Sequence, residues 1–140
     1  MIEPLYLLDT NTVSDLRKSR PSPQVAKWFV SIDLENYFLS TITLMELVKG
    51  MESVRKRDKP FAKLLDSWLF ELKEVKFLDR ILEVTPEIAE AAGRILSIRT
   101  RSEADALIAA TALTLRMILV TRNTADFEDT GVRMVNPWLE

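Results

Sequence analysis

The segment from Ser102 to Phe127 constrains the fold of this chain more than any other part of it. An alanine-rich run begins at Ser102 and carries Asp105 in its first turn, which is typical of a helix that starts at an acidic residue. The apolar run Met117–Val120 follows, short enough to be a buried strand, and leads into a polar turn that carries Asp126. A helix start and a strand end that each carry a carboxylate can meet in space if the sheet is parallel.

Four further apolar runs have the length of strands. They are Leu5–Leu8, Tyr37–Ile42, Arg80–Val84 and Val132–Val135. Segments with apolar residues at helical spacing lie between them, and their expected starts are Pro23 after Ser22, Thr43, Pro60, and Pro86 after Thr85. Strands that alternate with helices imply right-handed crossovers, and therefore an α/β fold whose parallel sheet has helices on both faces. No linker divides the 140 residues, so we expect a single domain over residues 1–140.

The composition excludes several classes of chemistry. The chain has no histidine and no cysteine, which removes Ser-His-Asp triads, histidine-based ribonuclease chemistry and ordinary zinc sites. A metal ion would have to be held by oxygen atoms, which favours Mg²⁺ or Mn²⁺. The net charge of −2 provides no global attraction to nucleic acid. No apolar run approaches the roughly 20 residues that span a bilayer, and Met1–Pro4 lacks the basic region of a signal peptide, so we expect a cytoplasmic protein without a membrane partner.

Acidic residues occur where the predicted strands end. Ligands of open parallel sheets bind beyond the carboxyl ends of the strands. Asp9 follows the first strand, Glu46 lies near the start of the helix after the second, and Asp126 follows the Ile118–Val120 strand. Asp105 is harder to place, because two helices separate the third strand from Ile118–Val120 and only the first of them must begin at this edge.

Each of these acids also has an ordinary structural role open to it. Asp9 can cap a turn, Glu46 can complete a capping box with Thr43, Asp105 can sit at the third position of a helix capped by Ser102, and Asp126 can be a loop acid. Four like charges at one edge, however, repel one another unless a cation neutralises them. The convergence therefore favours a Mg²⁺ or Mn²⁺ site, which suits phosphodiester hydrolysis by a metal-activated water.

Hydroxyl and amide side chains flank these acids. They are Thr10, Asn11, Thr121 and Asn123. Such groups can orient metal ligands or water, but the same residue types also form turns after strands. Both interpretations remain open from the sequence.

Several of these segments resemble PIN domains. The resemblance rests on Leu7–Asn11, Met45–Leu47, Ala104–Ala112, Thr121–Phe127 and the closing residues 131–138. It covers essentially the whole chain and is closest to the VapC/FitB-type ribonuclease toxins of bacterial toxin–antitoxin pairs. One departure is the segment Leu113–Met117, where relatives commonly have His-Gly before the strand.

The resemblance implies a three-layer α/β/α fold with a central parallel sheet, and an endoribonuclease toxin that depends on Mg²⁺ or Mn²⁺. It also implies a homodimer, inhibition by a cognate antitoxin, and binding of promoter DNA by the toxin–antitoxin complex. By position, Asp9, Glu46, Asp105 and Asp126 match the acidic quartet of the family. Asp9 and Asp105 are the expected metal ligands, Glu46 is expected to be a ligand or to activate water, and Asp126 to act directly or through a second metal.

An RNA substrate needs cationic partners for its phosphates. The candidates are Arg17, Lys18, Arg20, Arg55, Lys56, Arg57, Arg99, Arg101 and Arg122. Of these, Arg122 lies nearest in sequence to the proposed site. The predicted helix 60–72 is apolar on more than one face, and part of it is expected to pack against a second subunit or the antitoxin.

Two other functions remain open from the sequence. A phosphatase-like hydrolase would use Asp9 as a covalent nucleophile and would form a trappable aspartyl-phosphate, although no second Asp follows two residues after Asp9. A regulatory binding module without turnover would bind no metal ion and would not be toxic on expression.

Overall fold

The sheet has five strands in the order β3-β2-β1-β4-β5, and every neighbouring pair is parallel. The computed structural model describes residues 3–17 and 22–139. Its strands are β1 (Tyr6–Leu8), β2 (Tyr37–Ser40), β3 (Ile81–Leu82), β4 (Ile118–Val120) and β5 (Met134–Val135). All the predicted strands are present. Strand β4 has the predicted bounds Ile118–Val120, and the other four are shorter than the apolar runs that predicted them, because ladder hydrogen bonds form only where neighbouring strands overlap.

Helical elements connect the strands. The α-helices are α1 (Thr10–Arg17), α2 (Pro23–Val30), α3 (Thr41–Arg55), α4 (Lys59–Glu71), α5 (Pro86–Ile98) and α6 (Glu103–Thr114). Three shorter elements are the 3₁₀ helices η1 (Leu34–Asn36) and η3 (Thr124–Thr130) and the π-helix η2 (Leu72–Lys76), which continues α4.

The helix starts confirm most of the predicted caps. Thr85 Oγ1 accepts from the backbone N–H of Ile88, and Ser102 Oγ accepts from that of Asp105 at 3.0 Å. The prediction that Thr43 caps a helix is wrong. Strand β2 runs directly into α3, and the cap is Ser40, whose Oγ accepts from the N–H of Ile42.

Helix α1 was not predicted. Its sequence, Thr10–Arg17, is rich in polar and β-branched residues, which have weak helix propensity. It forms because Asp9 supplies an acceptor at its start: the N–H of Thr12 donates to Asp9 Oδ1 at 2.9 Å. On the opposite face of the helix, Val13 is buried in the core. Tertiary context therefore decides the structure of this segment.

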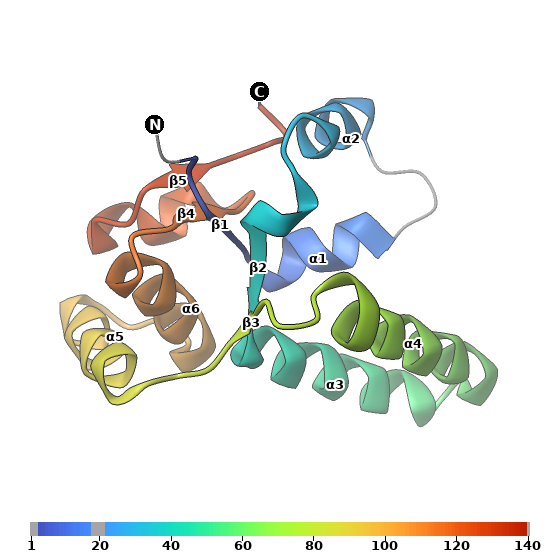
Figure 1. The fold of residues 1–140 in the computed structure, drawn as a ribbon. Coiled ribbons are helices and arrows are strands. Elements are labelled where there is room, and N and C mark those ends of the chain that lie inside the picture. Colours follow the sequence, from blue (N-terminus) through green and yellow to red (C-terminus); the bar gives the residue numbers. More distant parts are fainter. Residues whose placement is uncertain (1–2, 18–21, 140) are drawn as a thin grey trace.

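Both faces of the sheet are covered, as successive residues of each central strand show. Leu7 and Leu119 pack in a core with α5 and α6, whereas Leu8 and Val120 pack in a second core with α1, α3 and the residues of η2. Figure 1 shows α5 and α6 on one side of the strands and α1 to α4 on the other. This arrangement confirms the predicted three-layer α/β/α fold with a central parallel sheet.

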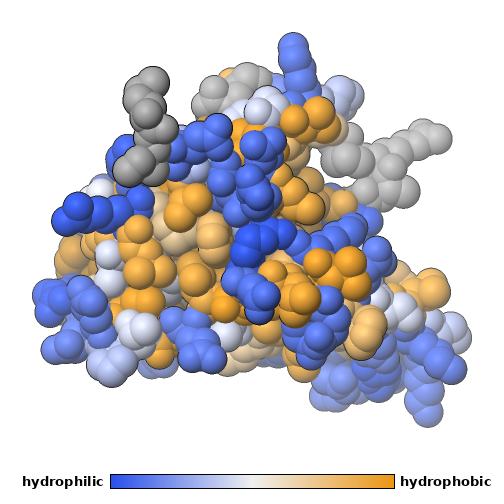
Figure 2. Space-filling model, viewed as in Figure 1, coloured by the Kyte–Doolittle hydropathy of each residue, from blue (hydrophilic) through white to orange (hydrophobic). Residues whose placement is uncertain are grey.

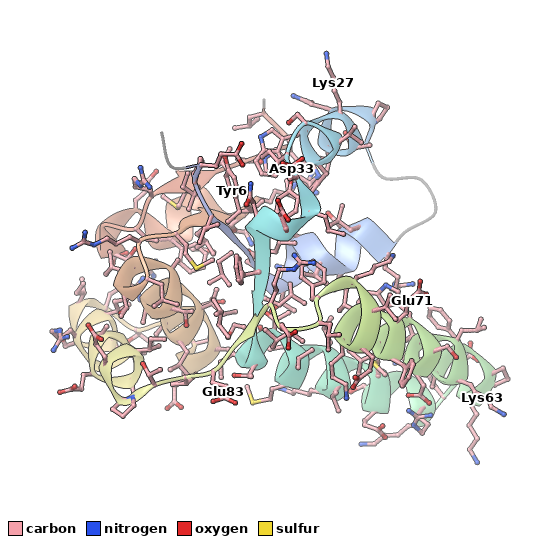
Figure 3. The ribbon with its side chains drawn as sticks, viewed as in Figure 1. Tyr6, Lys27, Asp33, Lys63, Glu71 and Glu83 are labelled. Carbon is pink, nitrogen blue, oxygen red and sulfur yellow. The ribbon has the colours of Figure 1, made fainter. Side chains whose placement is uncertain are left out.

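Side chains fill the space between the layers on both sides of the sheet, while Lys27 of α2 and Lys63 of α4 point outward (Figure 3). The surface in view mixes apolar and hydrophilic side chains (Figure 2). Across the described residues, no helix combines the length and the apolar character that crossing a membrane requires.

Candidate active site

Asp9 lies at the end of the central strand β1 and is 6% exposed. Its Oδ1 accepts from the N–H of Thr12 at 2.9 Å, and its Oδ2 accepts from the hydroxyl of Thr121 at 2.6 Å. Thr12 in turn donates to the carbonyl oxygen of Val120 at 3.2 Å. The carboxylate is therefore held between the carboxyl ends of β1 and β4. Asp9 caps α1 as well, so its ordinary structural role and its place in the site occur together.

Glu46 lies close to the segment that follows Asp9. The hydroxyl of Thr10 donates to Glu46 Oε1 at 2.6 Å and lies 3.1 Å from Thr43 Oγ1. Because α3 begins at Thr41, Glu46 is a full turn past the start of the helix, and the predicted capping box with Thr43 does not form. Its carboxylate is free for another role.

Asp105 is half-buried in the first turn of α6. Burial raises the pKa of its carboxyl group, and the charges of Asp9 and Asp126 raise it further, against the lowering effects of Ser102 and Arg101. Asp105 therefore lies within electrostatic range of Asp9 and Asp126. The second helix, α6, accordingly starts at the carboxyl edge of the sheet.

Asp126 is exposed on η3, directly beyond β4. Its N–H donates to the carbonyl oxygen of Asn123 at 3.1 Å. Its own carbonyl oxygen accepts from Arg99 Nη2 at 2.8 Å and from Arg101 Nη1 at 3.2 Å. These bonds attach η3 to the linker between α5 and α6, which explains why Asp105 and Asp126 lie near each other.

The acids do not form a closed ligand cage. Within residues 3–17 and 22–139, no three histidine, cysteine, aspartate or glutamate residues are grouped closely enough to hold a metal ion. The candidate ligands of the region nevertheless all carry oxygen: the carboxylates of Asp9, Glu46 and Asp105, with the hydroxyl of Thr121 bonded to Asp9 and that of Thr10 bonded to Glu46. Such donors fit a hard divalent cation such as Mg²⁺ or Mn²⁺ and do not fit zinc or copper.

The neighbouring predicted residues differ in their placement. Thr121 is fully buried, and its Oγ1 accepts from the N–H of Asn123 while donating to Asp9. The side chains of Asn11 and Asn123 are exposed, and Asn123 caps η3 without a side-chain bond. Arg122 is exposed as well, with its guanidinium 5.3 Å from the centre of the Trp138 ring.

Most of the cations predicted to contact RNA have partners within the protein. Arg55 pairs with Glu52 and Asp66, and Arg57 donates to the carbonyl oxygen of Ser53. Arg99 and Arg101 both pair with Asp129, while Arg17 packs over the rings of Phe61 and Trp68. Lys18 and Arg20 lie outside the described residues.

Sequence reasoning missed three residues that shape this region. Thr12 and Thr43 are fully buried beside Asp9 and Thr10, and Asp129 is the shared partner of two arginines. Buried threonines carry no distinctive sequence signal. The spacing of Asp126 and Asp129 on one helical segment was the available signal for a second acid at this place.

The sequence pattern of the PIN domain matches residues 6–132. The chain belongs to the PIN domain family. This PIN domain is similar to the plasmid stability protein StbB of Pseudomonas syringae pv. tomato, with 34% identity over 96% of this chain and 99% of the relative. It is also similar to the VapC ribonuclease Y4jK of Sinorhizobium fredii and to toxin FitB of Neisseria gonorrhoeae, each at 31% identity over 96% of this chain, covering 98% and 99% of those relatives.

Solved structures of relatives have the same fold. FitAcB from Neisseria gonorrhoeae matches with a TM-score of 0.79 and 30% identity, over 96% of this chain and 99% of that chain. The structure of FitAB bound to an IR36 DNA fragment matches with a TM-score of 0.82 and 30% identity, over 96% of both chains. The three-layer architecture around the carboxyl-edge acids is therefore that of this PIN domain family.

Proposed function

We propose that this protein is an endoribonuclease that depends on Mg²⁺ or Mn²⁺ and is the toxin of a toxin–antitoxin pair. Relatives that span nearly the whole chain are named as a VapC ribonuclease and as toxin FitB. The observation that carries the proposal is the buried Asp9 carboxylate, fixed by Thr12 and Thr121, with Asp105 electrostatically coupled to it.

The side chains have distinct roles in this proposal. Asp9 and Asp105 are the metal ligands, and Asp126 contributes a third carboxylate from the exposed side. Glu46, which accepts from Thr10, ligates the metal or accepts a proton from the attacking water. When bound, the divalent cation supplies a water of lowered pKa and offsets the charge of the scissile phosphate. Thr121 holds Asp9 in a fixed orientation, as outer ligand-supporting residues do.

The alternative with Asp9 as a covalent nucleophile receives less support. Both oxygens of Asp9 already accept hydrogen bonds, from Thr12 and Thr121, which stabilise the carboxylate and lower its nucleophilicity. Detection of an aspartyl-phosphate at Asp9 after incubation with a phosphoryl donor would favour that alternative over the ribonuclease.

The test is cleavage of a fluorogenic single-stranded RNA by the purified protein with Mg²⁺, Mn²⁺ or EDTA. We expect cleavage with either cation and none with EDTA. Asp9→Asn and Asp105→Asn should each lose about 100-fold or more of the rate, at the upper end of what ligand-orienting residues contribute. Asp66→Asn, on α4, is the control and should keep its rate. Full metal-dependent cleavage by both site variants would refute the proposal.

We also propose a homodimer and an antitoxin partner, whose complex with this chain binds promoter DNA. Exposed apolar side chains on α4, among them Leu64 and Phe70, support a protein interface there. One solved relative is described as a toxin–antitoxin complex from Klebsiella pneumoniae, and the structure of FitAB is bound to an IR36 DNA fragment. Light scattering of the protein alone, and after co-expression with the product of a neighbouring gene, measures both assemblies; a monomer in both samples would contradict this part.

A further inference from the structure

Arg101 is a cation that the proposed chemistry does not use directly, yet its side chain is only 4% exposed. It lies in the linker between α5 and α6, four residues before Asp105. Its Nη1 donates to the carbonyl oxygen of Asp126 at 3.2 Å and to Asp129 Oδ1 at 3.1 Å, and its Nη2 pairs with Asp129 Oδ2. Arg101 therefore connects the segment that precedes Asp105 to the backbone of Asp126.

A second arginine reaches the same two acceptors. Arg99 Nη2 donates to the carbonyl oxygen of Asp126 at 2.8 Å, and Arg99 Nε donates to Asp129 Oδ2 at 3.1 Å. The side chain of Arg99 is 45% exposed, so it forms the outer half of the arrangement. We refer to Arg99, Arg101, Asp129 and the Asp126 carbonyl as the Asp129 clamp.

Stability alone does not account for Arg101. Asp129 is in contact with solvent, with 30% of its side chain exposed, and ion pairs that solvent reaches contribute little net stability. Moreover, Arg101 Nε is buried with no hydrogen-bond acceptor among the described residues, and an unpaired buried donor is unfavourable. What the guanidinium does supply is geometry, since its planar fork fixes a carboxylate in two directions at once.

The 3₁₀ helix η3 needs such a fixing contact. Hydrogen bonds in 3₁₀ helices have poorer geometry than those in α-helices, so the position of each residue depends more on its side-chain contacts. Phe127 is the one buried residue of η3, and its neighbour Asp126 projects from the exposed side. Without the Asp129 clamp, the backbone at Asp126 would lose its two arginine partners.

We propose that Arg101 is a positioning residue of the active site, which acts through Asp129 and the Asp126 carbonyl to set the separation of the Asp126 and Asp105 carboxylates. The inference rests on the proposed metal-dependent ribonuclease function. A displacement of about 1 Å at a reacting group can reduce a rate by about 100-fold, so a contact that holds one acid relative to another has a measurable effect on turnover.

The variants Arg101→Lys and Asp129→Asn test the clamp in the full-length protein. Arg101→Lys keeps the positive charge but loses the planar fork. The matched control is the bidentate pair between α3 and α4, in which Arg55 Nη2 and Nη1 lie 2.6 and 3.0 Å from the two Asp66 oxygens. We expect kcat to fall about 10- to 100-fold in both clamp variants, as it does when ligand-supporting residues are changed, with little change in KM for RNA. Asp66→Asn, which breaks that pair without touching a residue of the proposed site, should leave both constants unchanged.

Binding of Mn²⁺, measured by electron paramagnetic resonance without RNA, separates positioning from charge. Removing a positive charge near the acids in Arg101→Gln would by itself tighten Mn²⁺ binding. A positioning role predicts the opposite, with weaker binding in both Arg101→Lys and Arg101→Gln. We also expect Arg101→Lys to retain more RNA-cleaving activity than Arg101→Gln, because it keeps the positive charge.

Wild-type kcat and Mn²⁺ affinity in folded Arg101→Lys and Asp129→Asn would overturn the proposed role of Arg101, whether or not the unfolding temperature falls. Tighter Mn²⁺ binding in Arg101→Gln would also overturn it. These outcomes differ from a failure of the ribonuclease proposal, which would appear as undiminished cleavage by Asp9→Asn. If Arg101→Lys does not fold, Asp129→Asn and Arg99→Lys give the same readouts, with Arg99→Lys expected to show the smaller loss.

Discussion

The two faces of the sheet are packed in different ways. On the face covered by α5 and α6, which we call the alanine face, helix α6 contributes small residues, and its Ala106, Ala109, Ala110 and Ala112 are all fully buried. The opposite face holds large aromatic side chains, with the Tyr6 and Trp28 rings 5.4 Å apart in an edge-to-face contact.

A cavity of about 360 Å³ accompanies the aromatic face. Its walls include Leu8, Val13, Phe29, Tyr37, Trp68 and Phe77. Small residues let a helix approach the sheet closely and leave it few alternative positions, whereas large side chains around an open cavity can repack. We infer that the close packing of α6 on the alanine face limits the movement of Asp105, while the aromatic face has more freedom to repack.

Replacing one phenylalanine on each face gives the largest expected difference. Phe127 is 3% exposed on the alanine face, and Phe77 is 5% exposed beside the cavity. Truncation to alanine in a close-packed core costs about 3–5 kcal/mol, and we expect Phe127→Ala to fall in this range. Phe77→Ala should cost about 1 kcal/mol less, because the cavity already limits its contacts. Urea unfolding measures both free energies, and equal losses would show that the two faces are packed alike.

Adding volume should also separate the two faces. Ala109→Leu inserts a larger side chain where the helix already contacts the sheet, and overpacking of this kind costs about 1–3 kcal/mol. Val13→Leu extends toward the cavity and should change the free energy of unfolding by less than about 1 kcal/mol. The same samples report on function: RNA cleavage should fall with Ala109→Leu, since α6 carries Asp105, and stay near wild type with Val13→Leu. A larger loss of stability and cleavage with Val13→Leu than with Ala109→Leu would contradict the inference that the alanine face is the more rigid one.

Besides Gly131, two of the described residues adopt left-handed backbone conformations, one associated with each face. Arg116 (φ 57°) lies between α6 and β4, and Asp79 (φ 64°) lies between η2 and β3. Arg116→Gly should stabilise the protein by about 1 kcal/mol, the penalty for a side chain in this conformation. Asp79→Gly should gain less, because aspartate tolerates it better. Thermal unfolding compares them, and a loss on Arg116→Gly would show that the side chain has a stabilising contact.

The smallest expected effect concerns Asp105 and its dependence on pH. Its pKa is raised in the folded protein, chiefly by burial, so ionisation at neutral pH opposes folding and this penalty vanishes below the ordinary pKa of 3.8. Asp105→Asn should therefore raise the unfolding temperature at pH 7 in the absence of divalent cations, with a gain that shrinks as the pH falls.

Asp66 provides the control of opposite sign. The hydrogen bond from Arg55 lowers the pKa of Asp66, so ionisation of this group favours folding. Asp66→Asn should lower the unfolding temperature at pH 7, and the loss should shrink in acid. If Asp105→Asn and Asp66→Asn shift the unfolding temperature in the same direction, the electrostatic description of the site is wrong.

Residues that act locally were predictable from the sequence, and residues that act across the fold were not. The apolar runs predicted where the strands lie along the chain and, with the helices between them, that the sheet is parallel. Ser102 and Thr85 identified helix starts because a cap is a short-range signal. Helix α1 was missed because its stability depends on Asp9 and on burial of Val13.

The same distinction applies to the site. Asp9 and Asp126 follow strands of a parallel sheet, so topology alone places them at its carboxyl edge. Asp105 required knowledge of where the second of two helices begins. The contacts of Arg101 with Asp129 and Asp126 depend on how the linker packs against η3, which no sequence spacing specifies.

The most direct test of the account is a titration of the wild-type protein and its variants with Mn²⁺, followed by electron paramagnetic resonance. We expect saturable binding to the wild type, weakened about tenfold or more in Asp9→Asn and in Asp105→Asn and unchanged in Asp66→Asn. Wild-type Mn²⁺ affinity in both Asp9→Asn and Asp105→Asn would show that the acids at the carboxyl edge of the sheet do not form the metal site.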